Sequence, residues 1–570
     1  MEVAMSVQYV VGINIGFHDS SACLLRDGAL RMMVEQERVS RRKRALAQSP
    51  ADAVAACLQA EGIGPDEVDV LAIGWDFRDT AIGRMKRFGD EALTRTILPG
   101  RTRPAPPVRW VPHHIAHAAS AYYSSGLEEA AVLVVDGAGE RTATTIATAT
   151  PAGIEIVREW PISQSLGFLY AAATRWSGFG DWGAGKLMGL AAYGRPCDDS
   201  PVRVTEDGYE LVIDGRRLEI AEDDGRAVRG PMLSQFPDFE KAMLGRFAEI
   251  YPYAERSDSG EDAIAYADFA ASIQNGLERA MAALAEQAAR TGKSALVLAG
   301  GVAMNCSMIG GLIRAGTFDT VYVPPVPTDS GVGLGAALVV AAEQDGFAPT
   351  VIDHPYWSND IDRDEAETAL TAAGLTGRKL AEDDLAAEVA GLLSAGRILG
   401  WARGRAEIGE RALGARSIIA DPRSRTTLRR LNVLKGREMW RPVAPSVLAE
   451  RIDEVMETPV GSPARFMLAA GRVRASMRTI VPAVTHVDGT ARPQLVDRRT
   501  NPGYWSMIEN FRRLTGVPLV VNTSFNLAGE PIVRTAADAV STFQRCPEMD
   551  ALVLGPMLVE RPENAGTRTN

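Results

Sequence analysis

Residues 131–140 read AVLVVDGAGE, an apolar run rich in β-branched residues that ends on an aspartate and a glycine-rich turn. A run of this kind, bounded by turn residues, predicts a buried β-strand. Two further strands are predicted at 142–148 and 154–157, on either side of the turn residues PAG at 151–153. This series of three strands decides the fold, because the chain contains it twice.

The other copy of the series lies nearer the start of the chain. Residues 9–16 read YVVGINIG and predict a buried strand, and strands are also predicted at 21–25 and 30–34, around the turn RDG at 26–28. Two such sheets with helices between them predict a duplicated ribonuclease-H-like fold, as in actin, sugar kinases and the heat-shock chaperones. In that fold, glycine-rich turns face each other across a cleft and hold phosphate groups through backbone N–H groups.

Further glycine-rich turns occur later in the chain. The apolar run at 295–299 leads directly into Gly300 and Gly301, and Asp329 is followed by a glycine at every second position from 331 to 335. Glycine lets the backbone approach a ligand closely. We therefore expect these turns to recur at the same cleft, as the duplicated fold requires.

Three of the six histidines fall within residues 113–117. On a helix, His113 and His117 share a face, whereas His114 points about 100° away. Imidazole is a common metal ligand, and Asp136, at the end of a strand, and Asp329 offer oxygen ligands. The pattern predicts a transition-metal site with open positions. The alternative is a helix whose histidines belong to the core or face solvent.

Length and charge limit the classes of protein to consider. With 570 residues the chain is too long for one core, and a polar, proline-containing stretch at 347–363 predicts a linker. We therefore expect two domains, residues 1–350 and 351–570. The net charge of -11, without a basic tract, argues against nucleic-acid binding.

The sequence predicts a cytoplasmic protein. It holds no apolar window of the ~18 residues that a membrane span needs, and its start carries an acid where a signal peptide needs basic residues. The five cysteines are scattered and form no C-x-x-C pair, which predicts reduced thiols rather than disulfides or a zinc ribbon. The sequence carries no signal for the oligomeric state.

Positive charge among glycines and apolar strands distinguishes the second half of the chain. A strand predicted at 397–401 precedes the run GRAEIGERALGARS at 404–417, and the run KGR follows at 435–437. Guanidinium and ammonium groups in such positions favour capture of polyphosphate or carboxylate. The alternative is a set of arginines scattered over the surface.

Together these motifs resemble the O-carbamoyltransferases of the NodU/CmcH family, and within it the enzymes that modify aminoglycosides such as tobramycin. The resemblance spans nearly the whole chain. Its markers in the first half are FHDSSA at 17–22, ERVSRRK at 37–43, HHIAH at 113–117, DGAGE at 136–140, GKLMGLAAYG at 185–194 and the glycines at 300–301. Its markers in the second half are GERALGARS at 409–417, REMWRPVAPS at 437–446, TARPQ at 490–494 and NTSFN at 522–526.

The resemblance implies an α/β protein with two parts. The N-terminal duplicated domain is similar to the metal-dependent subunit that transfers threonylcarbamoyl to tRNA, and the C-terminal part is an α/β adenylate-forming (YrdC-like) domain. It also implies an enzyme with two steps. Carbamoyl phosphate and ATP, with Mg²⁺, give carbamoyladenylate and diphosphate in the C-terminal domain. The N-terminal domain then passes the carbamoyl group to a small-molecule hydroxyl acceptor, implied to be an aminoglycoside or another antibiotic.

The resemblance also assigns residues to each step. With Fe²⁺ expected and Zn²⁺ or Mn²⁺ physically possible, the metal ligands are His113, His117, Asp136 and Asp329. For transfer, the base or carbonyl ligand and the group that stabilises developing charge are His18 and Lys43. The adenylate is expected to rest on Gly137, Gly139, Lys186, Gly300, Gly301 and Asn305. The first step is expected to use Arg411, Arg416, Lys435, Arg437, Arg492, Asn522, Ser524 and Asn526.

Two paired elements of the adenylate-forming fold occur in this last set. Lys435 and Arg437 resemble its lysine-x-arginine element, and Ser524 and Asn526 resemble its serine-x-asparagine element. Hydroxyl and amide groups at a strand end suit a nucleotide phosphate or a carbamoyl oxygen. A structural ion pair is the alternative for the arginines, Arg416 above all.

Other functions fit the sequence less well. An enzyme that modifies tRNA with threonylcarbamoyl shares both domain types, but the acidic balance of the chain counts against it. A sugar kinase-like ATPase leaves the histidine pair unexplained, and a metallopeptidase needs the glutamate of H-E-x-x-H. A nucleotide-binding protein without catalysis is the remaining alternative.

Some positions depart from the family pattern or allow a second interpretation. Glu410 stands where many members have proline, and Met439 stands where they have an aromatic residue; neither change removes a proposed chemical group. A turn histidine with satisfied hydrogen bonds is the alternative at His18. We expect acceptor specificity in the polar stretch 197–262, because loops vary most readily with substrate.

Overall fold

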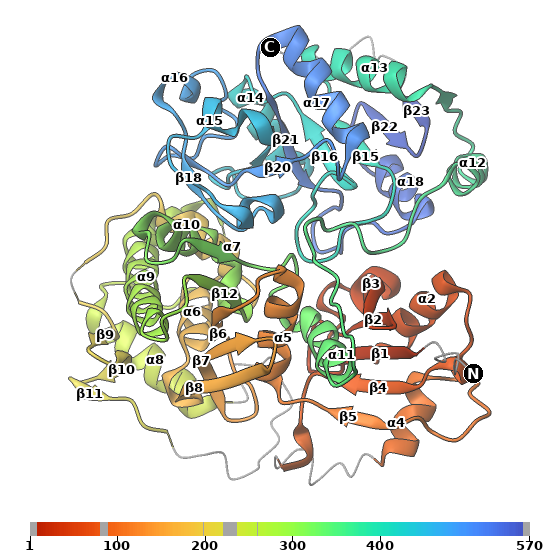
Figure 1. Ribbon diagram of the computed structural model, residues 1–570. Helices are drawn as coiled ribbons and strands as arrows, with labels where there is room; N and C mark the ends of the chain where they lie inside the picture. The colour runs from red at the N-terminus through yellow and green to blue at the C-terminus, as the bar shows by residue number, and fades with distance from the viewer. Residues whose placement is uncertain (1–7, 80–88, 198, 221–235, 259, 562–570) are drawn as a thin grey trace.

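The computed structural model describes residues 8–79, 89–197, 199–220, 236–258 and 260–561 of the chain. Its first five-stranded sheet has the order β3-β2-β1-β4-β5 (Figure 1). In this sheet β1 pairs antiparallel with β2 and parallel with β4. The strands are β1 (Tyr9–Asn14), β2 (Ser21–Arg26), β3 (Ala29–Glu35), β4 (Val70–Ile73) and β5 (Val108–Trp110).

A second five-stranded sheet repeats this arrangement, with the order β13-β12-β6-β7-β8. Here β6 pairs antiparallel with β7 and parallel with β12, as β1 does with β2 and β4. The strands are β6 (Ala130–Val135), β7 (Thr142–Thr150), β8 (Gly153–Pro161), β12 (Ala295–Ala299) and β13 (Thr320–Tyr322). The predicted duplication of the sheet is therefore confirmed.

One predicted boundary is wrong, because β1 ends at Asn14 and not at residue 16. The Asn14 side-chain amide donates to the backbone carbonyls of His18, at 3.2 Å, and Asp19, at 3.0 Å. The indole of Trp75 donates to Asn14 Oδ1 at 3.1 Å. Asn14 thus turns the chain out of the sheet and fixes the loop that carries His18.

Helices α5 (His113–Ser125) and α11 (Val332–Ala342) pack against each other between the two sheets (Figure 1). The contact depends on glycine. A Cβ atom at Gly335 would lie 1.7 Å from the carbonyl oxygen of Ala116 on α5. On the other side of α11, a Cβ atom at Gly12 of β1 would lie 2.0 Å from the carbonyl oxygen of Gly333. The backbones therefore meet directly, and α11 links the two halves of the duplicated fold.

The C-terminal part of the chain contains an eight-stranded sheet with the order β14-β23-β22-β15-β16-β21-β17-β20. It mixes parallel pairs, such as β15 with β22, and antiparallel pairs, such as β16 with β21. The strands are β14 (Arg378–Lys379), β15 (Leu399–Ala402), β16 (Arg416–Ala420), β17 (Ala444–Leu448), β20 (Gln494–Val496), β21 (Leu519–Ser524), β22 (Ala551–Leu554) and β23 (Met557–Glu560). The protein is thus mixed α/β in both parts, as expected.

Other helices and three smaller strands lie among the described residues of the first part. They are α1 (Gln36–Ser40), α2 (Ala51–Glu61), α4 (Asp90–Ile97), α6 (Leu166–Trp176), α7 (Ala184–Ala191), β9 (Val202–Thr205), β10 (Gly208–Ile213), β11 (Arg216–Arg217), α8 (Pro237–Ile250), α9 (Ala267–Ala289) and α10 (Cys306–Ala315). Those of the second part are α12 (Arg363–Ala372), α13 (Glu382–Ser394), α14 (Arg425–Leu434), α15 (Ile452–Val455), β18 (Gly471–Arg472), α16 (Ala475–Arg478), β19 (Thr490–Ala491), α17 (Pro502–Thr515) and α18 (Ala536–Gln544).

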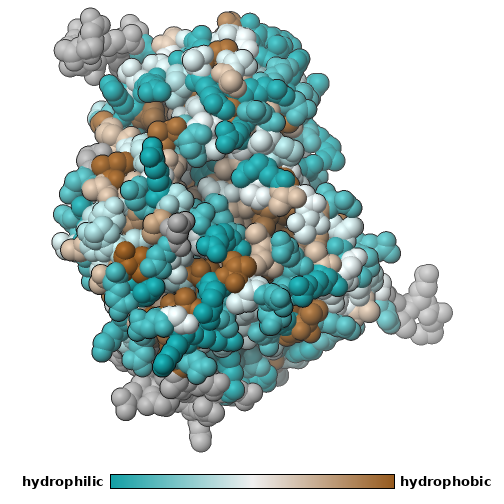
Figure 2. Space-filling model, turned by 90° about the vertical axis from the view of Figure 1, so that its left-hand side faces the viewer, coloured by the Kyte–Doolittle hydropathy of each residue, from teal (hydrophilic) through white to brown (hydrophobic). Residues whose placement is uncertain are grey.

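Hydrophilic side chains predominate on the face of the molecule that Figure 2 shows, and hydrophobic ones form small separate patches there. Among the helices of the described residues, none is long and apolar enough to cross a membrane. The large groups of hydrophobic side chains lie inside the protein. One continuous core extends through both parts of the chain, and a second core lies between the first sheet and helices α2 and α4.

The contact between α5 and α11 predicts a strong effect of Gly335→Ala. The added methyl group would collide with backbone, so the helices must separate, and we expect a loss of folding stability on the order of 1–3 kcal/mol or more. Gly245→Ala is the matched control, because Gly245 lies in α8 with open space around it, where alanine should stabilise the helix by about 1 kcal/mol. Thermal unfolding of the two variants measures the difference. Equal melting temperatures would contradict direct backbone contact.

Candidate active site and metal centre

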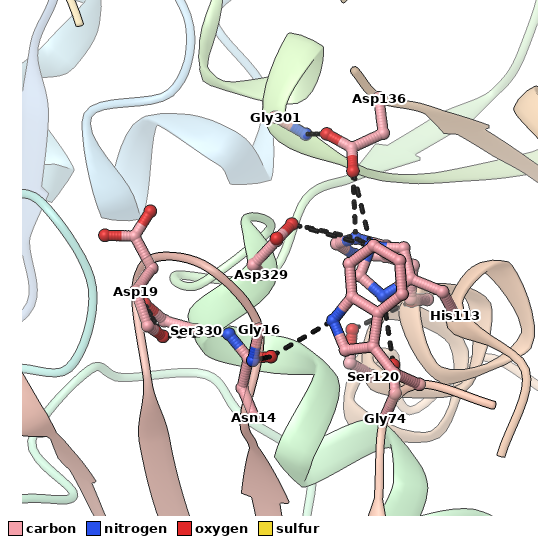
Figure 3. Close-up of polar contacts among 12 residues, drawn as sticks. Asn14, Gly16, Asp19, Gly74, His113, Ser120, Asp136, Gly301, Asp329 and Ser330 are labelled. Carbon is pink, nitrogen blue, oxygen red and sulfur yellow. Dashed lines mark hydrogen bonds and ion pairs between the residues drawn. The ribbon is translucent and has the colours of Figure 1, made fainter. Parts of the chain in front are cut away.

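Four buried side chains meet where α5, β6 and the start of α11 converge. They are the four-ligand cluster, His113, His117, Asp136 and Asp329, whose candidate ligand atoms all lie within 4.8 Å of one another. His113 Nε2 lies 3.4 Å from Asp136 Oδ2 and 3.5 Å from Asp329 Oδ1. Both carboxylates point toward the imidazoles (Figure 3). The sequence-predicted set is therefore brought together in space.

Hydrogen bonds outside the cluster orient its ligands. His113 Nδ1 donates to the carbonyl of Gly74 at 2.9 Å, so that Nε2 is the nitrogen that faces the carboxylates. The backbone N–H of Gly301 donates to Asp136 Oδ1 at 2.8 Å, so that Oδ2 is the oxygen turned toward the imidazoles (Figure 3). His117 Nε2 lies 3.1 Å from His113 Nε2. Two ring nitrogens so close need a cation or a shared proton between them.

The charges of the cluster also favour a cation between the imidazoles. Burial alone would lower the pKa of His113, yet Asp329 and Asp136 raise it to about 10. Although burial favours its neutral form, the two imidazoles hold the pKa of Asp136 well below its ordinary value. A buried pair of carboxylates thus demands compensating positive charge. Two nitrogen and two oxygen donors fit a transition metal, and they do not distinguish Fe²⁺ from Zn²⁺ or Mn²⁺.

His114 lies outside the cluster although its neighbours belong to it. Its Nδ1 lies 2.7 Å from the hydroxyl oxygen of Thr145 on β7. Burial, together with the imidazoles of His113 and His117, lowers the pKa of His114 to about 3. It is a neutral core histidine that packs under Gly139, where a Cβ atom would lie 2.9 Å from the His114 ring.

His18 lies in the loop after β1 and reaches the edge of the cluster. Its Nδ1 lies 2.9 Å from Asp19 Oδ2, and its Nε2 lies 3.8 Å from Asp329 Oδ2. Among the described residues, Nε2 is buried and has no hydrogen-bond partner. Although burial opposes protonation, Asp19 and Asp329 raise the pKa of His18. The ring therefore offers a free nitrogen to a ligand beside the four-ligand cluster.

One cavity of about 560 Å³ connects this site with the C-terminal part of the chain. Both parts supply its walls. The predicted site residues that line it are His18, Lys43, Asp136, Gly137, Gly301, Asn305, Asp329, Arg411, Arg437, Arg492, Asn522, Ser524 and Asn526. The predicted residues that do not line it are His113, His117, Gly139, Lys186, Gly300, Arg416 and Lys435.

The lysine-x-arginine and serine-x-asparagine elements meet at the cavity wall. Lys435, at the end of α14, donates from Nζ to the carbonyl oxygens of Ser524 and Asn526, each at 2.7 Å, and also contacts Asn526 Oδ1. Burial and the charge of Arg437 lower the pKa of Lys435 well below its ordinary value. Lys435 thus lies behind Ser524 and Asn526 and holds them at the surface of the cavity.

The expectation that Arg416 clamps phosphate does not fit its position. Arg416 is fully buried on β16. Its guanidinium donates to five backbone carbonyls, those of Arg403, Gly404, Ala415, Asn359 and Arg534. With its N–H groups committed to the fold, it ties the loop after β15 to the segment before α18. The structural alternative is therefore favoured for this residue, although its partners are carbonyls and not an acid.

Other predicted residues support the wall of the cavity through contacts within the fold. Lys186 on α7 lies 2.9 Å from Glu438 and so pairs with the C-terminal part of the chain. Gly300 has a positive φ of 88°, and a Cβ atom there would lie 2.2 Å from the Val135 carbonyl oxygen. The Asn305 side chain caps α10 and exchanges hydrogen bonds with Gln274. Lys186 and Gly300 thus shape the cavity from behind its wall, whereas Asn305 also lines it.

Several arginines gather where the C-terminal part of the chain lines the cavity. Burial and Arg492 lower the pKa of Arg411 to about 10, and burial and Arg441 lower the pKa of Arg437 to about 9. Nε of Arg411 is buried without a hydrogen-bond partner among the described residues. Cations that repel one another at the wall of a cavity favour binding of an anion. We call Arg411, Arg437, Arg441 and Arg492 the cation set.

Sequence reasoning missed some residues of this cavity. Arg441 belongs to the REMWRPVAPS motif but received no role, and Trp182, Arg44 and Glu410 also line the wall. Their only signal was position inside or beside a family motif. The predicted specificity segment 197–262 does not line the cavity in its described part, and its residues 198, 221–235 and 259 lie outside the described residues. Residues from the segment 167–192 line the cavity instead.

Comparison with known proteins places these observations in a family. The chain matches the carbamoyltransferase N-terminus model over residues 9–86 and 84–338, and the carbamoyltransferase C-terminus model over residues 390–561. It is 36% identical over 568 residues to nodulation protein NolNO of Sinorhizobium fredii, covering 96% of this chain and 80% of that protein. It is 38% identical over 455 residues to nodulation protein NolO of Bradyrhizobium diazoefficiens, covering 79% of this chain and 78% of that protein.

Similarity to solved structures is much weaker. The structure of full-length HypF has a TM-score of 0.31 and 16% sequence identity, over 60% of this chain and 56% of that one. Similarity at that level does not relate the two proteins. The two family models and the relatives do relate the chain to a family. Because the models together match most of the described sequence, the chain belongs to the carbamoyltransferase family of enzymes.

Proposed function

We propose that this carbamoyltransferase is an ATP-dependent O-carbamoyltransferase with two steps. The observation that carries the proposal is the shared cavity, which is lined both by ligands of the four-ligand cluster and by the cation set with Ser524 and Asn526. An anionic site suits activation, and a cluster that demands a cation suits acyl transfer. We assign activation to a domain of residues 351–570, which is adenylate-forming (YrdC-like), and transfer to a domain of residues 1–350.

The first step makes carbamoyladenylate at the cation set. Carbamoyl phosphate is hydrolysed to carbamate and orthophosphate. A carbamate oxygen then attacks the α-phosphorus of ATP, which is bound with Mg²⁺, and diphosphate leaves. Both reactants are anions, so the guanidinium groups of Arg411, Arg437 and Arg492 would hold them side by side. Ser524 and Asn526 would supply hydroxyl and amide contacts.

The second step transfers the carbamoyl group. An acceptor hydroxyl attacks the carbonyl carbon of carbamoyladenylate, a new C–O bond forms, and AMP leaves. His18 Nε2 would take the hydroxyl proton, and Lys43 would stabilise the charge that develops. A metal ion held by the four-ligand cluster, which we expect to be Fe²⁺, would supply Lewis-acid polarisation. For the acceptor we propose a natural-product hydroxyl, with an aminoglycoside such as tobramycin first, on the resemblance of the sequence motifs.

Diphosphate formation should depend on carbamoyl phosphate. With ATP alone we expect no diphosphate, and with both substrates we expect one diphosphate and one orthophosphate for each carbamoyladenylate. Separate ³²P labels in the γ-phosphate of ATP and in carbamoyl phosphate identify the source of each product. Orthophosphate that carries the γ label would instead favour the sugar kinase-like ATPase and contradict the two-step reaction.

Substitutions should separate the two steps. His113→Ala removes a ligand of the four-ligand cluster, so we expect transfer to fall by about 10²-fold or more while diphosphate formation persists. Lys435→Ala and Arg437→Met should lose diphosphate formation. Arg437→Met guards against a folding defect, because Arg437 lines the cavity and Lys435 is buried behind it. Product assays of both steps on each variant provide the measurement.

Equal loss of both steps in His113→Ala would contradict this division, provided that the variant unfolds at the same temperature as the wild-type protein. The metal content of His113→Ala gives a second readout. We expect it to fall well below that of Arg437→Met, because only the first substitution touches the four-ligand cluster.

A further inference from the structure

A single guanidinium joins the loop that carries His18 to the opposite half of the chain. Arg44 lies in the short 3₁₀ turn Lys43–Ala45. Its Nη1 lies 3.1 Å from Asp19 Oδ2 and 3.1 Å from Glu410 Oε1. The same oxygen of Asp19 lies 2.9 Å from His18 Nδ1. A continuous series of polar contacts therefore leads from Glu410, in the C-terminal part, to the imidazole at the transfer site.

The backbone around Arg44 adopts a conformation that residues with a side chain rarely take. Positive φ angles occur at Arg41 (57°), Arg44 (67°), Ala45 (45°) and Ala47 (53°). Hydrogen bonds to the His18 loop hold the turn, since Asp19 N donates to the Arg44 carbonyl at 2.7 Å and Ala47 N donates to the Phe17 carbonyl at 3.0 Å. Such strain persists only where the surroundings fix it, and it concentrates at functional sites.

Acidic side chains balance the positive charge of Arg44, unlike that of Arg411. Burial opposes its charge, but the carboxylates of Glu410 and Asp19, with that of Glu37, raise the pKa of Arg44. Its guanidinium carbon lies 4.7 Å from the ring centre of Trp182. Arg44 is thus held by acids and an aromatic ring, so its geometry suits support of a neighbouring group more than capture of phosphate.

We propose that Arg44 and Glu410 are positioning residues for carbamoyl transfer. Asp19 turns the Nδ1–H of His18 toward itself and leaves Nε2 facing the cavity. Arg44 holds Asp19 in place, and Glu410 holds Arg44. A residue adjacent to the cation set thereby sets the orientation of the imidazole that serves the other step. The inference rests on the proposed two-step function and adds a specific link between its two sites.

Substitution of Glu410 tests the link. With carbamoyl phosphate, ATP and tobramycin as probe acceptor, Glu410→Met should lower kcat for transfer about tenfold. The KM for tobramycin should stay within about twofold, and so should the rate of the first turnover of diphosphate formation, measured without acceptor. Glu410→Gln retains an acceptor for Arg44 and should recover about a third of the activity. Glu382→Met is the control, because Glu382 pairs with Arg403 away from the cavity, and it should leave both steps unchanged.

A double-mutant cycle separates positioning from general damage. Because Glu410 acts through Arg44, the variant that combines Arg44→Met with Glu410→Met should transfer no more slowly than Arg44→Met alone. Losses that simply multiply, or a first turnover of diphosphate formation that slows as much as transfer, would overturn the proposal.

An imidazole spectrum of ¹⁵N-histidine-labelled, Zn²⁺-reconstituted protein tests the same point without an acceptor. The hydrogen-bonded Nδ1 proton of His18, assigned with His18→Gln, should be present in the wild-type protein and lost or broadened in Glu410→Met. An unchanged signal would overturn the inference whatever the kinetics. If the wild-type protein forms no diphosphate, the proposed function fails and the spectrum still decides the positioning. If tobramycin accepts no carbamoyl group, only the choice of acceptor fails.

Discussion

The direct backbone contact between α11 and its neighbours determines where the site can form. Gly335 lets α11 touch α5, which carries His113 and His117, and Gly333 lets it touch β1, which leads into the His18 loop. The turn that begins α11 carries Asp329. Since side chains at either glycine would separate these backbones, the position of the four-ligand cluster depends on glycines outside it. Glycines without functional side chains thus determine the position of the functional side chains.

Two opposite charge imbalances face one cavity. On one side, buried carboxylates raise the pKa of His113 to about 10 and so call for a cation. On the other, burial and mutual repulsion lower the pKa of Arg411 to about 10 and so call for an anion. Low polarity inside the protein makes both demands strong. A metal ion and a set of phosphates would satisfy them together, and an activated carbamoyl group could then pass between neighbouring sites.

Much of the fold and of the four-ligand cluster could be predicted from the sequence because both depend on local patterns. Strand and turn periodicity gave the duplicated sheet, and the i, i+4 spacing of His113 and His117 placed them on one face of α5. The orientation of single side chains could not be predicted, because it depends on partners distant in the chain. Arg416 looked like a phosphate ligand, but five carbonyls from four segments occupy its guanidinium. The role of Arg44 could not be predicted from its place beside a motif, since its partner Glu410 lies in the other half of the chain.

The central claim is that activation and transfer use separate residues around one cavity. A single-turnover experiment with [¹⁴C]carbamoyl phosphate, ATP and tobramycin, stopped with acid and followed by mass spectrometry, tests it most directly. In His113→Ala the label should accumulate as carbamoyladenylate, to about one equivalent per protein, whereas in the wild-type protein it should pass on to the acceptor. The account is contradicted if His113→Ala forms no carbamoyladenylate, or if the wild-type protein carbamoylates the acceptor without consuming ATP.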